Sequence, residues 1–326
     1  MLLPRFARAI LTAAIIATLA LPEALAQGTY PNRPIRLIVP SSSGGGGDTI
    51  ARLVAQGLAD RLGLQVVVEN RPGAGGIIGY EIVAKAPADG YTLLFCAPTL
   101  AINPSTYKKV PYDAMRDFAP ITQAVFTPHL MIIHPSVPAR TVKEMIAFAR
   151  GRPGAVLYAS GGHGTAPHLA MELFALMAQI RMTHVPYKGA SPGVVDLIAG
   201  QVAIMAPAMI AVTPHVRAGK LRALGVTSAN RVAAAPDIPT IAEGGLPGYE
   251  TVVWYGLLAP AGTPQDIIAR LHKESVAILR APDSAERIAS TGAEVLASSP
   301  EEFGALIKAE TAKWAKVAKA AGIKPE

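Results

Sequence analysis

Short, strongly apolar segments alternate with longer amphipathic segments along most of this chain. From Ile35 to about Gly225 the short segments are rich in Val, Ile and Leu and predict buried strands, while the longer ones have helical periodicity. The predicted strands are 35–39, 66–68, 92–96, 123–126, 130–133, 156–159, 182–185, 202–205, 222–226 and 251–258. The predicted helices are 48–62, 76–86, 141–149, 165–179, 192–199 and 210–218, with further helices from about 264, 283 and 300.

Strands that are apolar throughout and separated by helices are typical of sheets covered on both faces. We therefore predict an α/β fold with two doubly wound, mostly parallel sheets. No low-complexity linker interrupts the 326 residues, and a chain of this length usually forms two domains. We expect domain 1 to comprise 27–125 and 252–326 and domain 2 to comprise 126–251, with hinges near Val125 and Val252.

Capping patterns mark the starts of three helices. Thr141 and Glu144 form a capping box, in which two side chains satisfy free backbone N–H groups. Thr263-Pro264 and Ser299-Pro300 each place a capping side chain before a proline at the first helical position.

The N-terminus has the pattern of a secretory signal peptide. Arg5 and Arg8 precede an apolar run at 9–21, and Ala24-Leu25-Ala26 supplies small residues at a cleavage position. An apolar core of roughly a dozen residues is too short for a membrane span. We predict cleavage after Ala26, which leaves 1–26 as a signal peptide and sends the mature chain to the periplasm.

Composition excludes several functions. Apolar residues make up 51% of the chain and charged residues 16%, which indicates well-formed cores. The net charge of +7 is scattered without a Lys/Arg run, so nucleic acid is not an expected partner. Cys96, the only cysteine, lies in an apolar segment and is expected in the core, so no intramolecular disulfide can form. We expect a monomer without a metal or other cofactor.

The most informative segment is a loop rich in serine and glycine between a predicted strand and a predicted helix. Open α/β sheets bind ligands at the carboxyl ends of their strands, and a helix N-terminus favours an anion. Three anions are possible ligands of this loop: a dinucleotide, a nucleotide phosphate and a carboxylate. Asp48-Thr49 stands where a phosphate-binding loop has Lys-Ser/Thr, and Glu69 fits the dinucleotide pattern only loosely. A turn without a ligand is the structural alternative. The candidate residues are Ser41, Ser42, Ser43, Gly44, Gly45, Gly46 and Asp48.

A second loop of the same kind follows the predicted strand 156–159 and opens a helix. Two such loops in different halves of the chain can face each other across a cleft, each donating backbone N–H groups to one carboxylate. We expect glycines such as Gly45 and Gly162 to be required for the backbone conformation and for close approach of the anion. The candidate residues are Ser160, Gly161, Gly162, His163, Gly164 and Thr165.

Patterns typical of enzymes are weak. The hydrolase motif G-x-S-x-G fails at Tyr158, and His163 and His168 are not spaced as zinc ligands on one helix face. A histidine placed as His168 is more often packed than catalytic. Tyr187 and Lys188 could form an acid–base pair, but no second titratable partner is evident, which favours a binding role.

Ordered motifs along the mature chain resemble the Bug-type (TctC-like) solute-binding proteins of tripartite tricarboxylate transporters. Besides the loop ending at Asp48, the matching segments are YPNRPIR at 30–36, VVENRPGAGG at 67–76, ADGYTLL at 88–94, PYD at 111–113, HVPYKG at 184–189, GKLRAL at 219–224 and GLLAPAGTP at 256–264. The resemblance implies a two-domain periplasmic-binding-protein (Venus-flytrap) architecture with two crossover hinge strands. It also implies a carboxylate ligand, membrane-spanning transporter subunits as separate chains, and no enzymatic activity.

In this family the loops after the first strand and after the Tyr-Ala-Ser strand hold the carboxylate, and here these are 41–48 and 160–165. The resemblance adds Thr99, His168, Tyr187, Lys188 and Pro207 as candidate ligand-binding residues. A carboxylate sensor for a membrane kinase and an α/β enzyme acting on a carboxylate are the alternative functions.

Two departures from the family pattern bear on the ligand. Ser41-Ser42-Ser43 replaces the usual Phe-Ala-Ala, which shrinks one wall and adds hydroxyls. Ala203 and Ala206-Pro207 stand where members often carry acidic or amide residues, so the ammonium of an amino acid would lack a partner. With Met205 and Met209 beside them, we expect an apolar wall and a dicarboxylate with an apolar or aromatic body. If these side chains face the core instead, a monocarboxylate or a citrate-like ligand is equally open.

Overall fold

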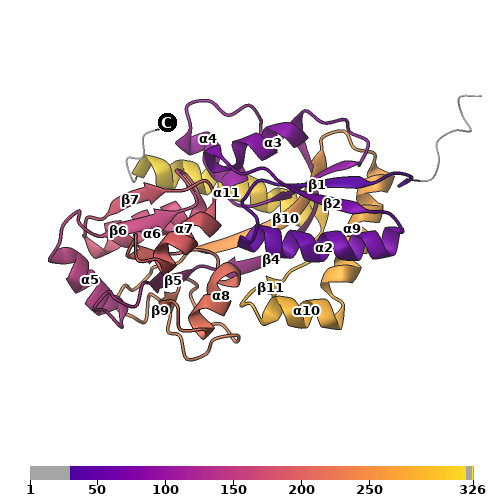
Figure 1. Ribbon diagram of the computed structural model, residues 1–326. Helices are drawn as coiled ribbons and strands as arrows, with labels where there is room; N and C mark the ends of the chain where they lie inside the picture. Colours follow the sequence, from indigo (N-terminus) through magenta and orange to yellow (C-terminus); the bar gives the residue numbers. More distant parts are fainter. Residues whose placement is uncertain (1–29, 321–324, 326) are drawn as a thin grey trace, which may run out of the picture.

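The computed structural model describes residues 30–320 and residue 325, so the predicted signal peptide lies outside the described residues. The described chain forms two α/β domains, each built on its own sheet and connected by extended strands (Figure 1). The predicted two-domain α/β architecture is confirmed. No helix in the described part of the chain is long and apolar enough to cross a membrane.

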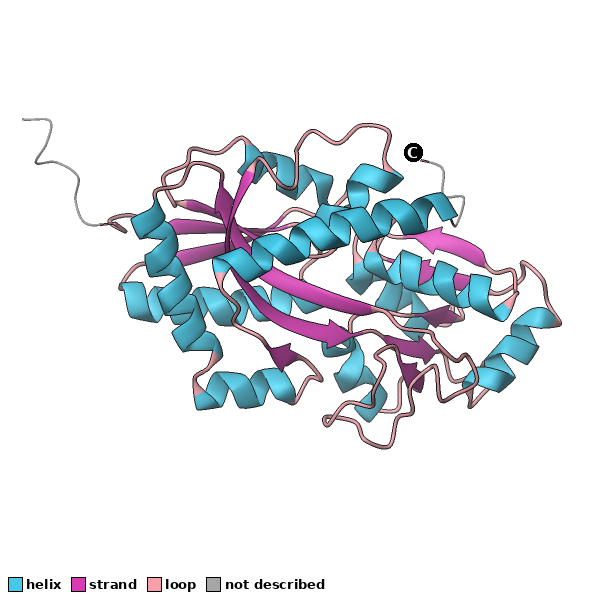
Figure 2. Ribbon diagram, turned by 180° about the vertical axis from the view of Figure 1, so that it is seen from behind, coloured by secondary structure: helices cyan, strands magenta, loops and turns pink. Residues whose placement is uncertain are grey.

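The first domain contains a six-stranded sheet in the order β11-β4-β10-β3-β1-β2. Its strands are β1 (Ile35–Val39), β2 (Val66–Asn70), β3 (Thr92–Cys96), β4 (Phe118–Pro128), β10 (Val252–Pro260) and β11 (Glu294–Val295). Its helices are α2 (Gly46–Leu62), η1 (Ala74–Gly76, a 3-10 helix), α3 (Ile77–Ala84), α4 (Thr99–Thr106), α9 (Gln265–Leu279), α10 (Pro282–Ala289) and α11 (Pro300–Ala320). Figure 2 shows α11, the longest helix of the described chain, lying across the front of the long strands that connect the domains.

The second domain contains a five-stranded sheet in the order β7-β6-β8-β5-β9. Its strands are β5 (Leu130–Ile133), β6 (Leu157–Ser160), β7 (Thr183–Pro186), β8 (Ile204–Met205) and β9 (Arg222–Val226). Its helices are α5 (Val142–Arg150), α6 (Ala166–Ala178), α7 (Ala190–Ile198) and α8 (Met209–Arg217).

The sheet of the first domain has a hydrophobic core on each face. Leu93 and Phe95 of β3 belong to one core with residues of α2 and α9, whereas Leu94 and Cys96 belong to another with residues of α3, α4 and α11. Side chains alternate between the two faces of a strand. A strand buried on both faces must therefore be apolar throughout, which explains the pattern in the sequence. Cys96 is fully buried, as expected.

The sheets are mixed, so the prediction of mostly parallel sheets is wrong. Each sheet has one parallel group, β2-β1-β3 in the first domain and β7-β6-β8 in the second. The strands β4 and β10, which carry the chain between the domains in opposite directions, pair antiparallel, and β5 is antiparallel to both of its neighbours. A chain that crosses over and returns along adjacent strands must produce such antiparallel pairs.

The crossover between the domains is centred on His129. β4 extends to Pro128 in the first sheet and β5 begins at Leu130 in the second, so we place the crossing a few residues beyond the Val125 hinge that the sequence suggested. The returning chain passes beside it, because His129 N donates to Thr227 Oγ1 at 2.8 Å and Thr227 Oγ1 donates to Thr251 O at 2.6 Å. All three residues are buried.

Two of the three predicted helix caps are present. Glu144 N donates to Thr141 Oγ1 at 3.2 Å, and Glu302 N donates to Ser299 Oγ at 3.1 Å. The third prediction is wrong: Thr263 Oγ1 donates to Pro260 O at 2.8 Å instead, and α9 begins at Gln265. The Thr263 hydroxyl therefore stabilises the turn that precedes α9 rather than the start of the helix.

Candidate functional site

A cavity of about 100 Å³ lies between the two domains. Its wall consists of segments that follow β1, β2 and β3 in the first domain and β6, β7 and β8 in the second, together with parts of β3 and β10 and the crossover residue His129. The carboxyl ends of parallel strands are where open α/β sheets bind ligands.

The cavity brings together residues of both predicted loops, but not all of them. Those that line it are Ser41, Ser42, Gly45, Gly46, Thr99, Gly161 and Thr165. Those that do not line it are Ser43, Gly44, Asp48, Ser160, Gly162, His163, Gly164, His168, Tyr187, Lys188 and Pro207. Several of this second group hold the loops in place, as described below.

Six helices contribute their cap or first-turn residues to this wall. They are α2, α3 and α4 of the first domain and α6, α7 and α8 of the second. The first N–H groups of a helix have no partner within it, and a helix N-terminus carries about half a positive charge. No Lys, Arg, Asp or Glu of the described chain lines the cavity. The wall therefore favours an anion through its backbone and offers no counter-ion to an ammonium group.

The glycine run of the first loop continues into α2, which begins at Gly46 rather than at Asp48. A Cβ on Gly46 would lie 2.5 Å from Ile210 Cγ2 of the second domain and 2.7 Å from the Tyr255 hydroxyl. Glycine is thus required here because the second domain approaches the start of the helix closely. Gly45 has φ −75°, which any residue can adopt, so the expectation of a special conformation is wrong for Gly45. Gly44 and Gly162, with φ +76° and +122°, do have one.

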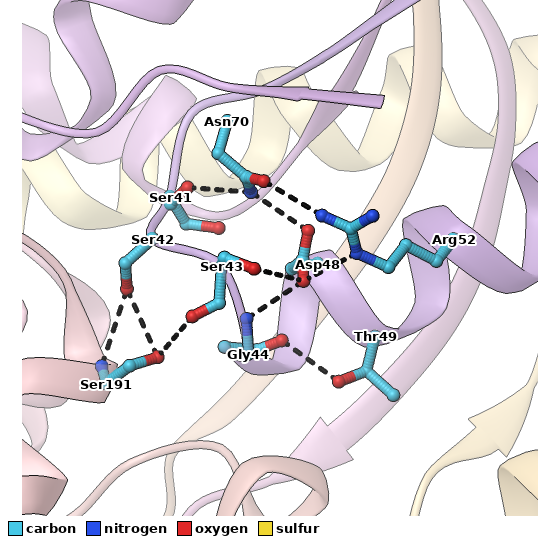
Figure 3. A network of polar contacts seen from close by, with 10 residues as sticks. Ser41, Ser42, Ser43, Gly44, Asp48, Thr49, Arg52, Asn70 and Ser191 are labelled. Carbon is cyan, nitrogen blue, oxygen red and sulfur yellow. Dashed lines mark hydrogen bonds and ion pairs between the residues drawn. The ribbon is translucent and has the colours of Figure 1, made fainter. Parts of the chain in front are cut away.

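Asp48 lies behind the first loop and holds its shape (Figure 3). Its carboxylate accepts hydrogen bonds from Gly44 N at 2.9 Å, Arg52 Nε at 2.9 Å and Asn70 Nδ2 at 2.9 Å. Asn70 also donates to Ser41 O at 3.1 Å. Burial alone would raise the pKa of Asp48, but the hydrogen bonds from Arg52, Gly44 and Asn70 outweigh it and hold the pKa below its usual value. Asp48 is therefore an ionised anchor for the loop.

Two histidines, His168 and His184, make hydrogen-bonding contacts with the second loop. His168 Nδ1 accepts from Gly164 N at 3.2 Å, and His184 Nε2 lies 2.6 Å from Ser160 Oγ, to which Gly162 N donates at 3.1 Å. The rings of His168 and His184 stack with centroids 4.2 Å apart. Burial and neighbouring histidines lower the pKa of His168 to about 3 and that of His184 to about 4, so both are neutral at physiological pH.

Tyr187 has an acidic partner that the sequence did not reveal. Its hydroxyl donates to Asp196 Oδ2 at 2.7 Å, and burial together with this bond raises the pKa of Tyr187 to about 12. The partner is nine residues further along, in the second turn of α7, so only the turn after β7 brings the two together. Neither Tyr187 nor the exposed Lys188 lines the cavity.

The serines of the first loop connect the two domains. Ser191, in the first turn of α7, donates from its Oγ to Ser43 O at 2.9 Å, and its N donates to Ser42 Oγ at 3.4 Å (Figure 3). Tyr107, which directly follows α4 of the first domain, donates from its hydroxyl to His163 O at 3.0 Å. Hydrogen bonds therefore connect the first loop to α7 of the second domain and the second loop to the end of α4 in the first domain.

The substituted segment after β8 faces the core rather than the cavity. Ala206 lies in one core of the second domain, and Met205 and Met209 lie in the other. The expectation that these methionines form the cavity wall is wrong; Ala208 and Ala211 form it instead. The wall at this segment is nevertheless apolar and lacks an anionic or amide side chain.

Sequence reasoning missed the aromatic and hinge residues of the cavity. Phe95 and Tyr255 lie in neighbouring strands and stack with centroids 6.2 Å apart, and Val253 and His129 lie beside them in the wall. Phe95, Val253 and Tyr255 stand inside apolar strand patterns that predict core, whereas His129 lies between two predicted strands. The 72–76 segment, whose glycines also line the cavity, did carry a signal, because it is a glycine-rich turn after a strand.

Three comparisons place the chain among known proteins. The family described as "Tripartite tricarboxylate transporter family receptor" (TctC) matches residues 50–323. Protein BugT of Bordetella pertussis is 38% identical over 311 residues, covering 95% of each chain. The R. palustris protein Rpa4515, solved with adipate, is 38% identical with a TM-score of 0.89, covering 91% of this chain and 100% of that one. The periplasmic binding protein BugD is 36% identical with a TM-score of 0.88 and the same coverage.

These matches span nearly the whole described chain and agree with the cavity between two mixed sheets. Both solved relatives share this two-domain fold, and BugD is described as a periplasmic binding protein. The chain therefore belongs to the TctC family of tripartite tricarboxylate transporter receptors, the Bug-type periplasmic solute-binding proteins.

Proposed function

We propose that this protein captures a small carboxylate in the cavity between its domains and delivers it to separate membrane subunits of a tripartite tricarboxylate transporter. The convergence of six helix N-termini on a cavity without charged side chains carries this proposal. Residues of both loops supply the contacts, and Ser41, Ser42, Thr99 and Thr165 add hydroxyl groups. The adipate bound by Rpa4515 supports a ligand with an uncharged body. Export through residues 1–26 and a monomeric state are part of the proposal.

The cavity offers no group suited to acid–base catalysis near neutral pH. The titratable side chains that line it are His129 and Tyr255. Burial lowers the pKa of His129 to about 3 and raises the pKa of Tyr255 well above 10. Neither side chain exchanges a proton readily at pH 7, which favours binding without chemistry.

Calorimetry with adipate, terephthalate, citrate, aspartate and glutamate tests the proposal. We expect at least one ammonium-free diacid to bind with micromolar affinity, about −8 kcal/mol, and to be recovered unchanged. The amino acids should not bind, because their ammonium group would be buried without a partner. Micromolar binding of aspartate or glutamate with none of the diacids, or conversion of a bound diacid into a product, would contradict the proposal.

A further inference from the structure

His129, a residue of the cavity wall, has a buried ring nitrogen without a hydrogen-bond partner. The residue lies between β4 and β5, where the chain passes from one domain to the other, and it is 1% exposed. Its Nδ1 lies 3.2 Å from Thr251 Oγ1, while its Nε2 has no hydrogen-bond partner. His129 is also among the residues that line the cavity. Buried polar atoms without a partner are uncommon in native proteins, and each calls for an explanation.

Two hydrogen bonds to Thr227 fix the backbone of His129. Its backbone N donates to Thr227 Oγ1 at 2.8 Å, and its backbone O accepts from Thr227 N at 3.0 Å. Because the ring is neutral, it has one N–H group and one lone pair. When the Thr251 hydroxyl donates to Nδ1, the proton is on Nε2, and a donor is then held ready beside the cavity.

Ser41 has the corresponding feature in the first loop. Its Oγ is buried, lacks a partner and belongs to the cavity wall. Two residues of the cavity wall therefore have unpaired side-chain groups: Ser41 in the first loop and His129 at the crossover. A molecule with a polar group at each end and an apolar body satisfies both.

We infer that His129 Nε2–H donates a hydrogen bond to the second carboxylate of a dicarboxylate whose first carboxylate is held by the helix N-termini, and that it thereby selects diacids over monoacids of the same length. This inference rests on the proposed function. According to this inference, His129 of the crossover, which belongs to neither loop, determines the preference for diacids.

Two matched pairs of probes and two variants test it. Adipate and hexanoate differ in one carboxylate, as do terephthalate and 4-methylbenzoate, and calorimetry measures all four. His129→Asn keeps an amide near the position of Nδ1 but has nothing at Nε2, whereas His129→Gln places its amide nitrogen near Nε2. We expect the wild-type protein to prefer the diacid of at least one pair by tenfold or more. H129N should lose this preference by weakening the diacid alone, and H129Q should restore part of it, while thermal unfolding confirms that both variants are folded.

The outcomes separate the inference from the function on which it rests. A wild-type protein that binds a pair without preferring the diacid overturns the inference and leaves carboxylate capture intact. The inference is also overturned if H129N keeps the preference or weakens both members of a pair equally. A wild-type protein that binds none of the four probes, nor citrate, overturns the proposed function itself.

Discussion

Replacing Gly46 by alanine tests whether the domains close around the ligand. Gly46 is the first residue of α2, and an added Cβ would lie 2.5 Å from Ile210 Cγ2 and 3.0 Å from Ala208 Cβ, both in the second domain. It would also lie 2.7 Å from the hydroxyl of Tyr255 in the first domain. Contacts this short do not persist between heavy atoms, so the second domain must move away from the start of α2.

The expected cost falls mainly on the closed arrangement. Overpacking a close contact costs about 1–3 kcal/mol. Alanine is favoured over glycine inside a helix by roughly 1 kcal/mol, but this preference acts whether the domains are open or closed and cancels from the binding free energy. Ligand affinity should therefore fall by about 1–3 kcal/mol, which is roughly 5- to 150-fold. The free energy of unfolding without ligand should change less.

Calorimetry with the carboxylate that binds most tightly in the panel measures the affinity, and solution scattering measures the radius of gyration. We expect the ligand to reduce the radius of gyration of the wild-type protein and to reduce that of Gly46→Ala less. Gly304→Ala is the matched control: it lies in α11, its Cβ would be 3.5 Å from Pro120 Cγ, and its affinity should be unchanged. A G46A protein that binds and contracts like the wild type would refute the reasoning.

Two further predictions concern the supports of the loops. Asp48→Asn should reduce the free energy of unfolding, measured in urea, by about 2 kcal/mol and weaken ligand binding, because the donors of Gly44, Arg52 and Asn70 lose a charged acceptor. The same change at the exposed Asp60 of α2 should have little effect. An equal loss of stability there would contradict the role assigned to Asp48. Lowering the pH from 6.5 to 5 should destabilise the protein by up to about 1.4 kcal/mol per pH unit for each neutral, buried histidine. The pKa values of His168 and His184, about 3 and about 4, lie below the unfolded value near 6.5, so the unfolded state takes up protons first and stability is complete only above pH 6.5. His168→Gln should reduce the slope of the unfolding free energy against pH, measured by urea unfolding from pH 5 to 7.5. An unchanged slope would contradict the assignment of this pH dependence to His168.

Most of the fold could be predicted from sequence because its cause is local. β3 is apolar and buried throughout, and β1 is so except for the exposed Arg36; a pattern of this kind is visible without tertiary information. The mixed pairing could not be predicted in this way, since the direction of β4 relative to β10 depends on the path of the whole chain. β11, with two residues, is too short to produce any pattern.

In the site, too, features with a local cause could be predicted from the sequence, whereas features that depend on tertiary contacts could not. Loops rich in Gly and Ser at strand ends are visible in the sequence, and both reach the cavity. The requirement for Gly46 could not be seen, because it comes from Ile210, which is distant in the sequence and lies in the other domain. Phe95 and Tyr255 look like core residues in sequence and in burial alike; only the arrangement of the two domains exposes them to a cavity.

On the proposed function, the distribution of helix ends between the domains ties anion binding to closure. Three of the six helices that begin at the cavity belong to each domain. A lysine in one wall would keep its full charge near the ligand whether the domains were open or closed. Helix ends act only over about one turn, so a carboxylate left on one domain after opening keeps the field of three helices and regains water on its other side. Affinity therefore depends on the domain arrangement itself, and a membrane partner that parts the two domains would release the ligand without having to compete for a salt bridge.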